Sequence, residues 1–233
     1  MVTPPAPSFT CGTSTISDID GNVYETVSIG TQCWTKTNLK VTKYNDGTDI
    51  PLDANGNSPG LSPIWGGLMI GSYTIYGNEA SSGTNATNYG FLYNWYAAKG
   101  IVTTGSTTYK NLCPTGYHVP TNAEWGTLTT FLSGSSGFNS AAAGKMKQIG
   151  FTLWNTPNTG ADNTSGFTAL PGGFRSEDGT FGDIRDFAMF WSATKFDTNP
   201  NFAYQCALRS FDDIAQRDVV NLKRGGSVRC LKD

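Results

Sequence analysis

The chain has 233 residues, of which 15% are charged and 12% aromatic, and its formal net charge is −2 at pH 7. A nearly neutral chain without a basic run is not expected to bind nucleic acid, because phosphate recognition needs clustered Lys and Arg. No stretch approaches the roughly 18 apolar residues of a membrane span, so we expect no membrane-spanning segment. The 28 glycines predict a loop-rich, mainly β protein that is long enough to bury a core.

The first ten residues, MVTPPAPSFT, are rich in proline and are interpreted as a linker. The length of 233 residues suits one large domain or two small ones, and we expect residues 11–233 to form one domain.

The segment after Cys11 predicts a β-hairpin. Asp20-Gly21 lies between alternating runs and marks its turn, and residues 23–29 suit a strand that ends at a glycine. Cys11 and Cys33 flank this hairpin, and a bridge between them would fasten the N-terminal extension to it.

The spacing of Asp18, Asp20 and Asn22 resembles the start of a calcium loop. Such a loop needs glycine at its sixth position and a bidentate glutamate at its twelfth. Here the glycine falls at position 21, and Ile29 stands where the glutamate is required. Calcium therefore stays an alternative without a complete motif, and no cofactor is expected.

Residues 45–88 consist mostly of turn formers and predict a long ordered loop that carries Trp65 and Tyr73. The aromatic stretch YGFLYNWYAAKG follows, and we expect it in the core, with a helical turn at NWYAA.

A helix is predicted after Thr121, within CPTGYHVPTNAEWGTLTTFL. Thr121 and Glu124 form a capping box, in which the hydroxyl accepts from a free helix N–H and the carboxylate reaches back. Trp125, Leu128 and Leu132 then share one helix face.

A second short helix is predicted in NSAAAGKMKQI, with Met146 and Ile149 facing inward. Beyond it we expect strands and loops, ending in a strand over residues 227–232.

The five cysteines contain no C-x-x-C, and the chain has one histidine, which argues against a zinc site. Two disulfides and one unpaired thiol fit this composition better and would indicate an oxidising compartment. The alternative left open is five reduced cysteines in a cytosolic protein.

Catalytic candidates are weak. His118 precedes a helix, where a backbone hydrogen bond is the more common role. Cys206 has no basic sequence neighbour to lower its thiol pKa, so we do not expect a nucleophile.

The acidic residues near RSEDGTFGDIRD are Glu177, Asp178, Asp183 and Asp186. They could act in pairs or hold a metal, but Arg175 and Arg185 are interleaved, so we interpret them as ion-paired loop charges.

Six segments occur in order: DGNVYETVSIGTQCWTKTNLKVTKYNDG, YGFLYNWYAA, CPTGYHVPTNAEWGTL, GFTALPGGFRSEDGTF, FWSAT and GGSVRCLKD. Together they resemble the Fibrobacter succinogenes major paralogous domain, common in surface and secreted proteins of Bacteroidetes-type bacteria and their phages, over about residues 11–233. The resemblance implies an α+β, C-type-lectin-like fold of the formylglycine-generating-enzyme variant. Such a fold has small antiparallel sheets, two helices and long ordered loops.

The resemblance also implies that Cys113 faces Cys230. A bridge there would close a loop of over a hundred residues and contribute roughly 4–5 kcal/mol in the chain-entropy model. Formylglycine-generating enzymes carry a catalytic cysteine pair, and this chain shows no counterpart, which argues against an enzyme.

The segment AYQCALRSFDDIAQRDVV keeps the family frame at Ala203 and Leu208 but departs elsewhere. It resembles the variable region of diversity-generating retroelements, which rewrite adenines near the 3′ end of lectin-fold genes. An unpaired Cys206 in a disulfide-bonded protein is more easily explained as a random product of such variation than as a selected residue. An ordinary binding face, or a face without a binding role, are the alternatives left open.

We therefore expect a non-enzymatic binding module of receptor or adhesin type that displays a variable face at residues 195–224. It would be extracellular, on a bacterial cell surface or a phage virion, and bind a protein or a surface glycan. A shell of Trp34, Trp95, Trp125 and Trp191 would hold the face. The candidate ligand-binding residues are Phe196, Asp197, Asn199, Tyr204, Gln205, Arg209, Phe211, Asp212, Gln216, Arg217 and Asp218. The alternatives are a carbohydrate-active or formylglycine-generating-like enzyme and a structural cell-surface module.

Overall fold

The computed structural model describes residues 8–53, 65–135 and 137–233. Within these ranges the helices are α1 (Thr84–Tyr89), α2 (Trp95–Lys99), α3 (Asn122–Ser133) and α4 (Ala143–Met146), with 3-10 turns η1 (Trp65–Gly67) and η2 (Tyr76–Asn78). No helix in the described part of the chain is long and apolar enough to cross a membrane.

Small antiparallel sheets make up most of the regular secondary structure in the described residues. The five-stranded sheet has the order β1-β2-β3-β12-β6, formed by Thr15–Ser17, Val23–Ile29, Gln32–Thr35, Leu231–Lys232 and Tyr117–His118. The three-stranded sheet has the order β11-β10-β9, formed by Gln216–Asn221, Phe202–Arg209 and Phe187–Lys195. The two remaining pairs are β4 (Tyr73–Thr74) with β5 (Leu92–Tyr93) and β7 (Phe174–Arg175) with β8 (Phe181–Gly182).

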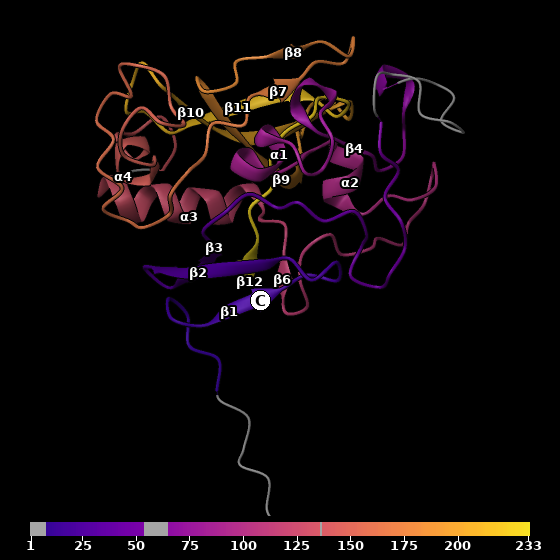
Figure 1. The fold of residues 1–233 in the computed structure, drawn as a ribbon, viewed down its shortest axis with the longest axis horizontal. Coiled ribbons are helices and arrows are strands. Elements are labelled where there is room, and N and C mark those ends of the chain that lie inside the picture. The colour runs from indigo at the N-terminus through magenta and orange to yellow at the C-terminus, as the bar shows by residue number, and fades with distance from the viewer. Residues whose placement is uncertain (1–7, 54–64, 136) are drawn as a thin grey trace, which may run out of the picture.

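The two larger sheets lie at opposite ends of the molecule (Figure 1). The five-stranded sheet forms the lower end of the view, β7, β8, β10 and β11 form the upper end, and β9 is labelled below them, at the level of the helices. Helices α1, α2 and α3 lie in the band between them. The small antiparallel sheets and short helices that were expected are therefore present, in a mainly β structure.

The local expectations for the first hairpin and the main helix are confirmed. β1 pairs with β2 across the turn at Asp20-Gly21. The capping box at the start of α3 is complete, with Thr121 accepting from the Glu124 amide and Glu124 bonding the Thr121 amide. NWYAA forms α2, with the Asn94 side chain as its cap.

The expectation that Ile149 faces inward is wrong, because its side chain is 63% exposed. The helix ends at Met146, and the backbone at Lys147 is already extended, so helical spacing no longer applies. Met146 is buried as expected, and the Lys147 side chain is buried in place of Ile149.

The number of helices and the extent of the final strand differ from the expectations, and the linker and the long loop are only partly described. The described part of the chain holds four short α-helices where two were expected. The final strand covers only β12, because residues 225–230 cross between the sheets and make single bridges. Residues 1–7 of the expected linker and residues 54–64 of the long loop lie outside the described residues. Phe9, inside the expected linker, lies against the ring of Tyr117.

The tryptophan shell predicted from the sequence is confirmed. Trp34, Trp95, Trp125 and Trp191 are each at most 2% exposed. Trp34 and Trp125 lie in a cluster around α3, whereas Trp95 and Trp191 lie in a second cluster around α2. The shell therefore covers both halves of the core.

Residues 225–231 connect these two halves. The Gly226 amide donates to Tyr93 O at 2.9 Å, and the Trp191 amide donates to Ser227 O at 3.0 Å. Further along, the Leu39 amide donates to Val228 O at 2.9 Å. The segment thus contacts β5, β9 and the chain after β3 in turn, which fixes their relative positions.

Arg229 lies at the middle of this segment and is fully buried. Its Nε donates to Asn38 Oδ1 at 2.7 Å, and its Nη1 donates to Thr35 O at 2.9 Å and to Phe167 O at 2.8 Å. Its Nη2 donates to Thr168 O at 2.7 Å. Burial lowers the pKa of Arg229, and these four oxygens replace the water that the cation has lost.

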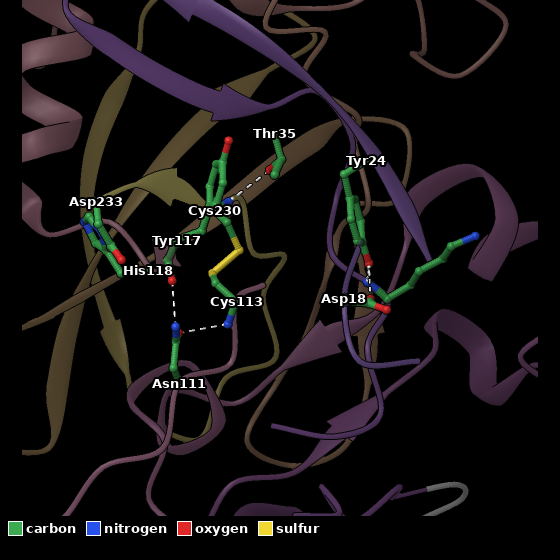
Figure 2. The surroundings of a disulfide bond; sticks show 10 residues. Asp18, Tyr24, Thr35, Asn111, Cys113, Tyr117, His118, Cys230 and Asp233 are labelled. Carbon is green, nitrogen blue, oxygen red and sulfur yellow. Dashed lines mark hydrogen bonds and ion pairs between the residues drawn. A yellow bond between two sulfur atoms is a disulfide. The ribbon is translucent and has the colours of Figure 1, made fainter. Parts of the chain in front are cut away.

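The prediction of two disulfides and one unpaired thiol is confirmed. The disulfides are Cys11–Cys33 and Cys113–Cys230. Figure 2 shows the second bridge, with the Cys113 amide donating to Asn111 Oδ1 and the Cys230 amide donating to Thr35 Oγ1. The bridge spans 117 residues, so the chain-entropy model gives roughly 5 kcal/mol of stabilisation. The bridge and Arg229 therefore fasten the same segment.

Replacing Arg229 with Met should lower the free energy of unfolding by about 3 kcal/mol or more. The change leaves four buried oxygens without donors, each costing about 1–3 kcal/mol, although removing a buried charge offsets part of that cost. Arg229→Lys should lose less, since an ammonium can bond some of the same oxygens. Urea unfolding measures both variants, and a Met variant as stable as the parent would contradict this role.

Candidate ligand-binding surface

The predicted face at residues 195–224 comprises the end of β9, all of β10 and β11, and the turns between them. β10 is the central strand of its sheet, so residues 203–208 are buried on both sides. Tyr204 is 8% exposed and Gln205 is 1% exposed. The structure therefore places these two predicted residues inside, and the surface is formed by β11 and the two turns.

The remaining candidates do not share one face. Arg217 lies opposite Cys206, and Asp218 lies opposite Gln205. Side chains at paired positions point to the same side, and consecutive residues point to opposite sides. We therefore distinguish an Arg217 face, which packs toward α3, from an Asp218 face on the other side of the sheet.

The Arg217 face brings together Phe196, Asp197, Tyr204 and Arg217. The Arg217 guanidinium lies 5.3 Å from the centroid of the Tyr204 ring. Phe196 meets the same ring edge-on at 5.5 Å, and the Tyr204 hydroxyl donates to Asp197 Oδ2 at 3.5 Å. Tyr204 is thus a buried support for its exposed neighbours.

The Asp218 face brings together Arg209, Phe211, Asp212, Gln216 and Asp218. Arg209 forms an ion pair with Asp212, and its guanidinium lies 5.0 Å from the centroid of the Phe211 ring. The Phe211 side chain is exposed. An exposed aromatic ring beside a held guanidinium is typical of protein-binding hot spots.

Asp218 lies in a mixed electrostatic environment. Burial raises the pKa of its carboxyl, and Arg209 and Arg224 act against that rise. The Gln205 amide lies at the paired position, and its Oε1 and Nε2 have no hydrogen-bond partner among the described residues. These two atoms are buried inside the sheet beside Gly226, so they support the Asp218 face from below and are not part of its surface.

Sequence reasoning missed Arg224. Its guanidinium carbon lies 3.6 Å from the centroid of the Phe174 ring, and burial lowers its pKa, with Asp218, Glu177 and Asp183 opposing. The contact forms because the turn after β11 lies beside β7 in the fold. These segments are far apart in sequence, so no sequence signal could have found it.

Asn199 shapes a turn. Its Oδ1 accepts from the Asn201 amide at 3.0 Å, and its carbonyl accepts from the Phe202 amide at 3.1 Å. Its amide side chain therefore orders the loop before β10.

The turn between β10 and β11 is anchored through its main chain. Lys147 is fully buried, and its Nζ donates to Thr159 O at 2.8 Å, Arg209 O at 2.9 Å and Asp212 O at 2.8 Å. These acceptors belong to the backbone, so the three hydrogen bonds do not use the side chains of the turn, whereas the carboxylates of Asp212 and Asp213 add an electrostatic contribution.

The flank of α4 holds the same turn by two further contacts. The Ala143 amide donates to Asp213 O at 2.9 Å, and the Ala215 amide donates to Ser140 O at 3.0 Å. Residues 209–215 are therefore tied to the frame at both ends by backbone groups.

The acidic residues near β7 and β8 do not form the expected ion pairs with Arg175 and Arg185. Arg175 is buried and pairs with Asp53, with Nη1 3.6 Å from Oδ2. Arg185 Nε donates to Asn155 Oδ1 at 3.0 Å. The prediction from the interleaved spacing was wrong because both arginines contact segments that are distant in sequence.

His118 does not bond the backbone as expected. Its Nδ1 lies 2.7 Å from Asp233 Oδ1, and its Nε2 lies 3.0 Å from Glu124 Oε1. Burial raises the pKa of Glu124, whereas its hydrogen bonds to Thr121 and the charge of His118 lower it. The lowering effects are together larger, so the net shift of the pKa is downward. The imidazole thus links β6, the α3 cap and the C-terminal strand.

Cys206 packs within the core cluster around α3 and is fully buried, and burial raises the pKa of its thiol. It behaves as a small apolar residue.

The oxygens of the calcium-like segment are already used. Asp18 accepts from the Asp20 and Asn22 amides and from the Tyr24 hydroxyl, as Figure 2 shows for the last. Asp20 Oδ2 accepts from Thr42. Among the described residues, no three His, Cys, Asp or Glu side chains form a group suited to a metal ion.

Stability should rise with pH above about pH 8 because of Lys147. Burial lowers its pKa to about 8, with Asp212 and Asp213 opposing, whereas an unfolded lysine titrates near 10.4. Between these values the unfolded chain binds more protons, so raising the pH favours the folded state, with a limiting slope of about 1.4 kcal/mol per pH unit.

Urea unfolding of the parent and of Lys147→Met from pH 7 to 9.5 measures this contribution. The difference between the two proteins cancels the opposing effect of the Cys206 thiol, whose pKa is raised. The parent should gain stability relative to the variant across this range, and parallel curves would contradict the assignment.

Comparison with known proteins supplies the family. Residues 27–232 match the family described as the Fibrobacter succinogenes major domain. A search of curated proteins found no match, and neither did a search of solved structures. Because the match covers most of the 233 residues, the chain belongs to the Fibrobacter succinogenes major domain family.

Proposed function

We propose that this protein is a non-enzymatic ligand-binding module of receptor or adhesin type. Its ligand contacts come from β11, the turn between β10 and β11, and the turn before β10. The observation that carries the proposal is the backbone anchoring of residues 209–215 by Lys147 and the α4 flank. Side chains there can change without loss of the bonds that hold the turn.

The energetic reason for binding is preorganisation. Arg209 is held by Asp212, and Arg217 and Arg224 lie over aromatic rings. Side chains that are fixed before association lose less entropy when a ligand arrives. Aromatic and arginine side chains are also those that contribute most to interface affinity.

We propose a C-type-lectin-like arrangement and an extracellular location, on a bacterial cell surface or a phage virion. The small antiparallel sheets support the first, and the two disulfides support an oxidising compartment. The ligand is a protein or a surface glycan.

Programmed variation by a retroelement is part of the proposal, with support from sequence alone. Cys206 gives it no support, because a buried thiol is an ordinary packing residue. An imperfect, adenine-specific repeat of the 3′ end beside a reverse transcriptase gene would mark programmed variation; its absence would leave ordinary divergence.

Replacing Arg209 and Phe211 with Ala should reduce ligand capture at least about tenfold and leave melting nearly unchanged. The two side chains supply a cation and an exposed ring, and a partly exposed ion pair contributes little to stability. The tagged protein is applied to a glycan array and to a panel of fixed bacterial cells.

Phe131→Ala is the matched control, because Phe131 is 61% exposed on α3 and outside the predicted face. It should bind like the parent. A parent that binds none of these targets would contradict the function, and a double variant that binds normally would contradict this surface. Equal losses of melting temperature and capture would place the two residues in the core.

A further inference from the structure

A cleft of about 340 Å³ lies between the start of α3 and β11. Three of its lining residues, Ala123, Gly126 and Gly137, are too small to fill it. Its polar groups come from the remaining positions, Asn122, Asn139 and Arg217, and Phe138 completes the wall. The cleft therefore combines free space with a few polar residues in its lining, which is typical of small-ligand sites.

The guanidinium of Arg217 contacts two aromatic rings but has no carboxylate partner among the described residues. Its guanidinium lies 5.3 Å from the centroid of the Tyr204 ring and 5.9 Å from that of Phe138. The residue is exposed, and it forms no salt bridge within the described part of the chain. Ring contacts occupy the faces of a guanidinium, whereas its N–H donors point outward from the edges and suit a carboxylate.

Asn122 offers a second unpaired group. Its Oδ1 is buried and has no hydrogen-bond partner among the described residues. Its amide N–H donates to Thr194 Oγ1 at 3.1 Å, so the backbone at this position is fixed. A buried polar atom without a partner is costly, and a ligand hydroxyl or water would satisfy it.

Asn139 is held on the other wall. Its φ is 62°, a left-handed conformation that Asn tolerates, and its amide donates to Ala215 O at 2.8 Å. The contact joins this wall to the anchored turn before β11. The walls of the cleft are thus preorganised on both sides.

We propose that this cleft binds an acidic sugar, with its carboxylate on Arg217 and its hydroxyls on Asn122 and Asn139. The proposal rests on the ligand-binding function above and names the ligand class for the Arg217 face. An aspartate or glutamate side chain would satisfy Arg217 alone, because it carries no hydroxyl for the amides. A sugar acid satisfies both kinds of group and better fills the space.

Calorimetric titration with a trigalacturonate tests this site. The parent should bind it, and the methyl-esterified trisaccharide should bind at least about tenfold more weakly, because the charged hydrogen bonds are lost. Arg217→Gln should weaken binding to a similar degree, and Asn122→Ala should also weaken it. Lys99→Gln is the matched control, because Lys99 is also a cation over an aromatic ring, that of Tyr109, and does not line the cleft, and it should bind like the parent.

Equal affinity of parent and Arg217→Gln, or of the acid and its ester, would overturn the proposal. A glutamate-rich peptide that competes as well as the sugar would show that the carboxylate alone is recognised, which also overturns it. A parent that captures targets through Arg209 and Phe211 but ignores trigalacturonate would refute this site and leave the proposed function standing.

Discussion

The buried guanidinium of Arg229 is the interaction on which the rest of the structure depends. It bonds oxygens of Thr35, Asn38, Phe167 and Thr168, which belong to segments far apart in sequence. An isolated buried cation would be strongly unfavourable, so the closed core requires these oxygens as partners. The segment around Arg229 thereby fixes the positions of both larger sheets.

This frame explains how a turn can be both ordered and free in its side chains. Lys147 and the α4 flank hold residues 209–215 through backbone oxygens and amides. Because backbone groups are the same for every residue except proline, the displayed side chains contribute little to these contacts. Arg217 and Asp218 then diverge to two faces, so one strand can present two distinct surfaces.

Features set by neighbouring residues could be predicted from the sequence, and features set by strand order could not. The capping box at Thr121 depends on four consecutive residues, so its pattern was sufficient. The burial of Gln205 depends on β9 and β11 lying on either side of β10, which no local pattern reveals. The cleft beside Arg217 likewise needs α3 to approach β11, so sequence reasoning found the arginine but not its surroundings.

The most direct test of the frame compares side-chain replacement with backbone replacement in the turn between β10 and β11 and in β11 itself. Phe211, Asp212, Gln216, Arg217 and Val219 are changed together to Ser, and Ala215→Pro is made alone to remove the amide that donates to Ser140 O. Thermal unfolding should show the fivefold variant within about 5 °C of the parent and the proline variant well below it. A fivefold variant that unfolds, beside a proline variant that melts like the parent, would contradict a frame built on backbone contacts.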